Sequence, residues 1–190
     1  ELKAEVERGT VVGETNIADA SGTPRSLKIR EEPVEPNPEA IAAVMEADSI
    51  VVGPGSLYTS ILTNFLEPRL CRAIRETRAP LIYVSNLMTE AGETDGYTVA
   101  DHLEKFREVP PEPVEFDYVL VNTRQAPQRL LEEYEAEGAD QVIFDYDRVK
   151  QYDCEIRTGS FMSIGDHLRH DVESVTEEVR RILQEETMQP

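Results

Sequence analysis

Short apolar runs and amphipathic stretches alternate along most of the chain. Four apolar runs have the composition of strands that are buried on both faces: 49–52, 81–85, 118–121 and 141–144. Between and after these runs, apolar residues recur at helical spacing: 61–66, 70–77, 99–106, 130–134 and 172–183. A buried strand, a helical crossover and another buried strand form a βαβ unit, which implies parallel pairing. The pattern predicts an α/β fold in which helices flank a parallel sheet and residues 1–190 form one domain.

The first part of the chain has a different pattern. Alternating apolar positions from Leu2 to Val12 predict a short β-hairpin, and 26–30 is a third candidate strand, so that 1–36 is a β-rich subregion. The proline-rich stretch 31–38 reads as a stiff connector. Asn37 and Pro38 have the residue types of an N-cap and a first helical position, and they predict a helix that ends near Ala47.

A glycine-containing turn follows the first buried strand, at Gly53, Pro54 and Gly55. If a helix begins after this turn, its free N–H groups and the positive end of its dipole can hold a phosphate or carboxylate. The glycines would let a ligand approach the backbone closely, and the hydroxyl groups would donate hydrogen bonds to it. The ligand-binding residues predicted here are these residues and their neighbours: Gly53, Pro54, Gly55, Ser56, Leu57, Thr59 and Ser60. The alternative is a tight structural connection in which the glycines serve backbone geometry only. The turn is not a Walker loop, because no Lys-Ser or Lys-Thr follows its glycines.

Loops that follow parallel strands meet at one edge of the sheet, where ligands bind. The sequence places three loops there, at 53–60, 86–98 and 122–127, and adds Asn86, Thr89 and Asn122 to the predicted ligand-binding residues. The second loop is long and polar for an α/β connection, which favours a functional role. Its Glu93 and Asp95 are candidates for catalysis or Mg²⁺ binding, and a solvated loop explains them as well. His102 has the position of a packed or capping histidine.

Composition and charge exclude several classes of partner. The formal charge of −19 repels nucleic acids and anionic lipids, although a local set of donors can still bind a phosphorylated small molecule. No apolar run is long enough to span a bilayer, and the charged first residues do not form a signal peptide. Cys71 and Cys154 have the spacing of neither a disulfide framework nor a zinc site. These features predict a cytoplasmic protein. The chain does not begin with Met, which suggests a processed, tagged or truncated product.

Three motifs carry a resemblance to a known family: GPGSLYTSI at 53–61, NLMTEAGETDGYTVADHL at 86–103 and DYVLVN at 117–122. They closely resemble the YvcK-type gluconeogenesis factor family, which is related to the 2-phospho-L-lactate transferases (CofD) of deazaflavin coenzyme biosynthesis. The resemblance covers nearly the whole chain. This sequence departs from the family pattern at Thr63 and at 67–69, and the family's N-terminal glycine-rich loop is not in it. The chain therefore resembles the C-terminal part of such a protein.

The resemblance implies a Rossmann-like fold that binds a nucleotide diphosphate sugar, such as UDP-glucose or UDP-N-acetylglucosamine. It also implies a regulatory role, without catalysis or a bound metal, in growth and cell shape on gluconeogenic carbon sources. The transferase relatives supply an alternative, an enzyme that moves a phospholactyl group with Mg²⁺. A third alternative is an interaction module whose acidic surface binds a protein partner. The sequence leaves the sugar and a homo-oligomeric state open.

Tyr134 and Arg169 are two further candidates for ligand binding. Tyr134 can stack on a nucleobase, and the planar guanidinium of Arg169 can pair with a diphosphate. A core aromatic residue and a surface arginine are the alternatives. Resemblance to the family's C-terminal region favours the binding roles.

Overall fold

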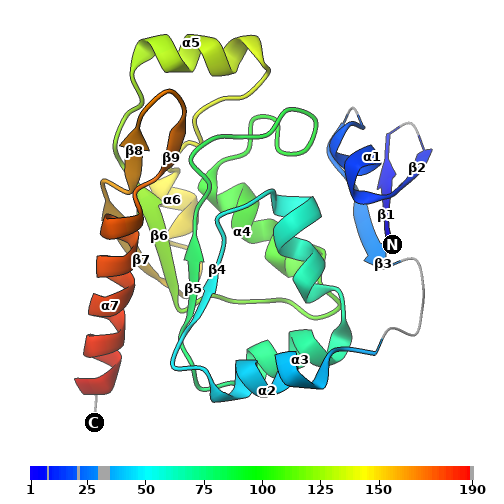
Figure 1. Cartoon of the computed structure of the whole chain (residues 1–190), viewed down its shortest axis with the longest axis vertical. Coiled ribbons are helices and arrows are strands. Elements are labelled where there is room, and N and C mark those ends of the chain that lie inside the picture. The colour runs from blue at the N-terminus through cyan, green and yellow to red at the C-terminus, as the bar shows by residue number, and fades with distance from the viewer. Residues whose placement is uncertain (8, 21, 30–34, 189–190) are drawn as a thin grey trace.

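The computed structural model describes residues 1–7, 9–20, 22–29 and 35–188. A four-stranded parallel sheet in the order β4-β5-β6-β7 forms its centre (Figure 1). The strands of this sheet are β4 (Ile50–Val52), β5 (Leu81–Val84), β6 (Tyr118–Asn122) and β7 (Glu155–Gly159). The predicted α/β fold with a parallel sheet is therefore confirmed.

Helices cover both faces of this sheet, because alternate strand residues point to opposite sides. Ile82 and Val84 of β5 pack with Ile182 of the last helix, whereas Leu81 and Tyr83 belong to the larger core on the other face. Figure 1 shows the last helix on one side of the sheet and α4 on the other. The helices around the sheet are α2 (Pro38–Glu46), α3 (Pro68–Glu76), α4 (Val99–Glu108), α5 (Gln128–Ala136), α6 (Tyr146–Val149) and α7 (Val172–Met188).

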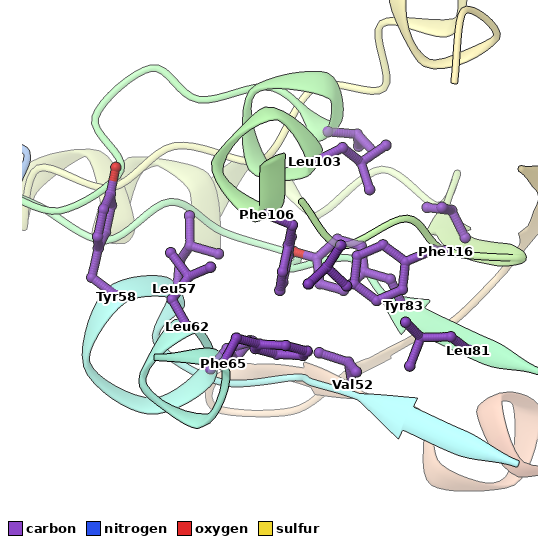
Figure 2. Packing of buried hydrophobic residues seen from close by; sticks show 14 of the residues in the cluster. Val52, Leu57, Tyr58, Leu62, Phe65, Leu81, Tyr83, Leu103, Phe106 and Phe116 are labelled. Atoms are coloured by element: carbon purple, nitrogen blue, oxygen red, sulfur yellow. The ribbon is translucent and has the colours of Figure 1, made fainter. Parts of the chain in front are cut away.

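The larger core contains a group of aromatic rings between α4 and the sheet (Figure 2). Phe106 of α4 contacts Phe65, Tyr83 and Phe116 edge to face, with ring centroids 5.5, 5.2 and 4.8 Å away. Edge-to-face contacts of this kind add to the stabilisation that burial alone gives. Phe106 therefore joins the helix layer to strand β5 and to the chain that enters β6.

A small antiparallel sheet in the order β2-β1-β3 lies on the far side of α4 from α7 (Figure 1). Its strands are β1 (Leu2–Val6), β2 (Gly9–Val12) and β3 (Ser26–Ile29). The predicted hairpin and third strand are confirmed, although Arg30 lies outside the described residues. Between β2 and β3 the chain forms the short helix α1 (Glu14–Ala18).

The helix predicted after Asn37 is also confirmed. The Asn37 side chain accepts a hydrogen bond from the Glu39 N–H at 2.9 Å, Pro38 is the first helical residue, and the helix ends at the C-cap Ala47. The cap satisfies one of the free N–H groups at the start of a helix. Of the predicted connector before it, residues 31–34 lie outside the described residues.

The prediction of a strand at 141–144 is wrong. These residues form only isolated bridges, between Met88 and Gln141 and between Thr98 and Ile143. The fourth strand of the sheet is β7, which pairs with β6. Its sequence, EIRTG, lacks the apolar pattern of a buried strand. The charged Arg157 is accommodated there because it forms ion pairs with Glu178 and Glu185 of α7.

The segment after the glycine turn is helical but is not a regular α-helix. It consists of a single turn of π-helix, η1 (Leu57–Ile61), followed by a 3-10 turn, η2 (Leu62–Phe65). After β7 the chain adds a two-stranded hairpin that the sequence pattern did not predict, β8 (Met162–Ile164) and β9 (Leu168–His170). Within the described ranges, no helix has the length and apolar character needed to cross a membrane.

Candidate functional site

The glycine turn lies at the carboxyl end of β4, and its two glycines differ in their surroundings. Gly53 has a φ of +87°, and a Cβ atom on it would lie 3.0 Å from the Val84 carbonyl oxygen. Gly53 is therefore explained by backbone geometry alone. Gly55 has no positive φ, and a Cβ there would meet only ordinary contacts at 3.6 Å, with Ile61 and Ser60. The fold does not require a glycine at Gly55, which leaves room for a role in ligand approach.

The segment Ser56–Ile61 turns back on itself directly after Gly55. The N–H groups of Ser60 and Ile61 both donate to the Ser56 carbonyl oxygen, each at 3.0 Å. Of the predicted binding residues here, Leu57 and Thr59 are buried, whereas Pro54 and Ser60 are exposed. A π-type turn is common at functional sites. Pro54 and Ser60, with Gly53, line a cavity of about 290 Å³ beside β4.

The long loop 86–98 holds the glycine turn through three side chains. Asn86 donates from Nδ2 to the Gly55 carbonyl oxygen at 2.9 Å. The Thr59 hydroxyl donates to Glu93 Oε1 at 3.2 Å, and the hydroxyl oxygens of Tyr58 and Tyr97 lie 2.8 Å apart. Two of the three loops that the sequence places at the sheet edge, 53–60 and 86–98, are therefore in direct contact.

Thr89 and Asn122 have their hydrogen-bonding groups occupied within the protein. The Thr89 hydroxyl accepts from the Asp140 N–H at 2.8 Å. Asn122 accepts from the Phe161 N–H at 3.1 Å and donates to the Arg124 carbonyl oxygen at 2.8 Å. Both line a second cavity, of about 710 Å³, which the glycine turn does not line. Neither residue lines the cavity beside the turn.

Tyr134 contacts the hairpin β8–β9 at the residue that precedes Arg169. The Leu168 N–H donates to the Tyr134 hydroxyl oxygen at 3.2 Å, and Leu168 directly precedes Arg169 on β9. Tyr134 is half-buried against the cluster around Leu130 and Leu168. Arg169 is exposed, and it has no ion-pair partner among the residues that the structure describes.

His170 connects this hairpin to the glycine turn, and sequence reasoning did not select it as a site residue. Its Nε2 lies 3.0 Å from the Ser85 carbonyl oxygen, and because a carbonyl only accepts, Nε2 donates. Ser85 precedes Asn86, which binds Gly55. A series of contacts therefore runs from the glycine turn through 85–86 to β9 and Tyr134. The only sequence signal for His170 is its place between Arg169 and Asp171, before the last helix.

We expect His170 to make the fold sensitive to acid. Burial lowers the pKa of its imidazole, and the hydrogen bond to Ser85 only partly opposes this effect. The unfolded chain therefore takes up this proton at a higher pH than the folded chain, so stability falls as the pH decreases below about 6.5. In His170→Gln, whose amide can still donate to Ser85, the loss of melting temperature between about pH 7.5 and 5.5 should be smaller than in the wild type. The exposed His167, in the same hairpin, supplies the control His167→Gln. Equal losses of melting temperature in the wild type, His170→Gln and His167→Gln would contradict this role of His170.

The candidate acidic residues of the long loop do not converge on a common point. Glu93 is buried and bonded to Thr59, whereas both carboxylate oxygens of Asp95 accept from the Gly92 N–H, at 3.0 and 3.2 Å. Over the described ranges, His, Cys, Asp and Glu side chains nowhere gather in a group of three or more that could hold a metal ion. These residues do not fit a Mg²⁺ site, and no chemical step through Mg²⁺ follows from them.

The packed role of His102 follows from its contacts. Its side chain is completely buried, and Nδ1 lies 2.8 Å from the Thr98 carbonyl oxygen, to which it donates. Thr98 and Asp101 form a capping box at the start of α4. Burial lowers the pKa of His102, so the imidazole stays neutral and serves the packing of α4.

Comparison of the sequence with known proteins identifies the family of this chain. The model of the 2-phospho-L-lactate transferase CofD family matches residues 1–162. The chain is 43% identical over 150 residues to a putative gluconeogenesis factor of Thermotoga maritima, covering 78% of this chain and 47% of that protein. It is 36% identical over 186 residues to the gluconeogenesis factor of Bacillus subtilis, covering 97% of this chain and 58% of that protein.

A solved structure agrees with these sequence matches. The crystal structure of a UPF0052 family protein from Bacillus halodurans superimposes with a TM-score of 0.88 at 35% identity, and the match covers 94% of this chain and 58% of that chain. The chain thus spans between about half and three fifths of the length of these relatives. It belongs to the CofD/UPF0052 family and is a homologue of the gluconeogenesis factors.

Proposed function

We propose that the protein binds a nucleotide diphosphate sugar, of the UDP-sugar type, at the carboxyl edge of its parallel sheet. The diphosphate lies at the glycine turn and pairs with Arg169, and Tyr134 contacts the nucleobase. The series of contacts from Gly55 through Asn86, Ser85 and His170 to Tyr134 is the observation that supports this proposal. Carboxyl edges of parallel sheets are the usual place for such ligands.

The proposed role is regulatory and cytoplasmic. The protein binds its ligand without turnover and controls growth and cell shape when cells use gluconeogenic carbon sources. Its relatives are named gluconeogenesis factors, which supports this role. The Asn86 amide and the hydroxyl groups of Ser56 and Ser60 at the turn are groups of the kind that hold an anion.

Calorimetric titration with uridine, guanosine and adenosine diphosphate sugars tests the proposal. We expect a uridine diphosphate sugar to bind most tightly. In Gly55→Val the affinity should fall beyond detection, because the new side chain occupies the approach of the diphosphate. The variant should still fold, since a Cβ at this position meets only contacts at 3.6 Å.

Gly165→Val is the matched control. Gly165 lies in the β8–β9 connection, where a Cβ would have no neighbour closer than 3.8 Å. Its affinity should equal that of the wild type. If folded Gly55→Val bound every nucleotide sugar as well as the wild type does, the turn would be a structural connection only.

The phospholactyl transferase is the alternative function, and the match to the CofD family model supports it. Incubation of the protein with Mg²⁺, a phospholactyl nucleotide donor and a deazaflavin acceptor that carries a free hydroxyl group distinguishes the two functions. Multiple turnovers of the donor would favour the transferase. Binding of nucleotide sugars without turnover is the result expected for the regulator.

A further inference from the structure

Glu93 is a buried carboxyl group in the loop that holds the glycine turn. Only 2% of its surface is exposed. One carboxyl oxygen, Oε1, accepts from the Thr59 hydroxyl at 3.2 Å. The other, Oε2, is buried and has no hydrogen-bond partner within the described part of the chain. An ionised carboxylate would leave a strong acceptor unsatisfied there, which is costly in a protein interior.

The charges around Glu93 also oppose its ionisation. Burial is the largest influence and raises the pKa of the carboxyl, and the negative charges of Glu90 in the same loop and Glu14 of α1 raise it further. The Thr59 hydroxyl and the Tyr58 backbone act in the opposite direction without cancelling this increase. Tyr58 carries no charge, since burial also raises the pKa of its hydroxyl. The charged groups that act on Glu93 in the described part of the chain, Glu90 and Glu14, are both acidic.

Glu93 contacts the segment that precedes and shapes the proposed ligand site. Thr59 lies in η1, four residues after Gly55, and Asn86 and Tyr97 of the same loop fix the turn on either side of this contact. A negative charge on Glu93 would lie under a segment that has to hold a diphosphate. Repulsion between two negative charges is strong where little water separates them.

We propose that Glu93 is a positioning residue whose neutral carboxylic acid holds η1 in its ligand-binding arrangement, and that loss of its proton weakens ligand binding. The predicted loss of ligand affinity rests on the proposed function. Its structural part, a proton kept on Glu93 in the folded protein, is independent of any ligand. The proton leaves to solvent and no other bond changes.

Melting temperature as a function of pH tests the structural part without ligand. An acid whose folded pKa is raised contributes stability that is present at low pH and is lost as the pH rises through the folded value. Glu93→Gln copies the neutral acid in shape and keeps the acceptor for Thr59. The variant should therefore gain stability relative to the wild type as the pH increases from about 5 to 8.5. Glu46→Gln, on the exposed surface of α2, should show no such gain. A constant difference between wild type and Glu93→Gln at every pH would overturn the inference.

Titration with UDP-N-acetylglucosamine over the same pH range tests the binding part. Wild-type affinity should fall by about tenfold towards high pH, a change of roughly 1.4 kcal/mol, whereas the affinity of Glu93→Gln should stay constant. Glu93→Ala, which removes the contact with Thr59, should bind weakly at every pH. The same pH dependence in wild type and Glu93→Gln would overturn the positioning role. If no variant bound any nucleotide sugar, the proposed function would fail, while the melting curves would still decide the state of Glu93.

Discussion

Replacement of Phe106 by alanine is expected to lower the free energy of unfolding by about 3 to 5 kcal/mol. The ring is completely buried and contacts Phe65, Tyr83 and Phe116 (Figure 2). Removing it takes away the transfer free energy of the ring and leaves a cavity between α4 and the sheet, whose rigid aromatic neighbours can fill it only in part. Chemical denaturation followed by circular dichroism measures the change.

Phe144→Ala is the matched control for this substitution. Phe144 is only half-buried, and its ring contacts Tyr146, which is exposed. Phe144 packs against the edge of the same core, so we expect a smaller loss, of about 1 kcal/mol. Equal losses for the two phenylalanines would contradict the view that the Phe106 cluster is the centre of the fold.

The interior of the sheet could be predicted from the sequence because parallel strands that are buried on both faces have almost no polar positions. This is true of β5, whose four residues are all buried, and of most of β6. Strand β7 could not be found in this way. Its Arg157 and Glu155 form an ion pair with each other, and Arg157 also pairs with α7, a helix that is distant in sequence.

For residues 141–144 the pattern predicted a strand that the sheet does not contain. Three of the four are apolar, as in a buried strand, but their backbone pairs with loop 86–98 and the start of α4 instead of the sheet. The Val142 N–H donates to the Leu87 carbonyl oxygen, and the Val99 N–H donates to the Ile143 carbonyl oxygen. A short apolar run such as Val142 to Phe144 cannot reveal its partner, because the composition of the run is the same whether it joins a sheet or covers a loop.

The candidate site was predictable in its motifs but not in its arrangement. The glycine turn and the long loop are visible because they follow apolar strands directly. The contact between Tyr134 and β9 depends on a hairpin whose strands are only three residues long and carry Ser163, Arg169 and His170. The burial of Glu93 depends on the path of an irregular loop, which no periodicity describes.

Arg169→Ala is expected to weaken nucleotide-sugar binding by about ten- to a hundredfold. Hydrogen bonds to charged groups contribute about 1.5 to 3 kcal/mol, which corresponds to this change in affinity. The side chain is exposed, so its interaction with a diphosphate should weaken as salt screens it, and the loss should be larger at 0.05 M than at about 0.5 M salt. Arg129→Ala, an exposed arginine on α5 that pairs with Glu133, removes the same charge and should leave the affinity unchanged.

Tyr134 should respond in a different way from Arg169, since its contribution comes from its ring. Stacking on a base is worth roughly 1 to 3 kcal/mol in nucleic-acid sites, so Tyr134→Ala should lose affinity with little dependence on salt. Tyr134→Phe keeps the ring and loses only the hydrogen bond from the Leu168 N–H, at a cost in stability of about 1 kcal/mol. Its affinity should stay close to that of the wild type.

Calorimetry at two salt concentrations, with a melting curve for each variant, separates binding from stability. If Arg169→Ala and Tyr134→Ala both kept wild-type affinity, and Tyr134→Ala lowered only the melting temperature, Tyr134 would be a packing residue and Arg169 an ordinary surface arginine.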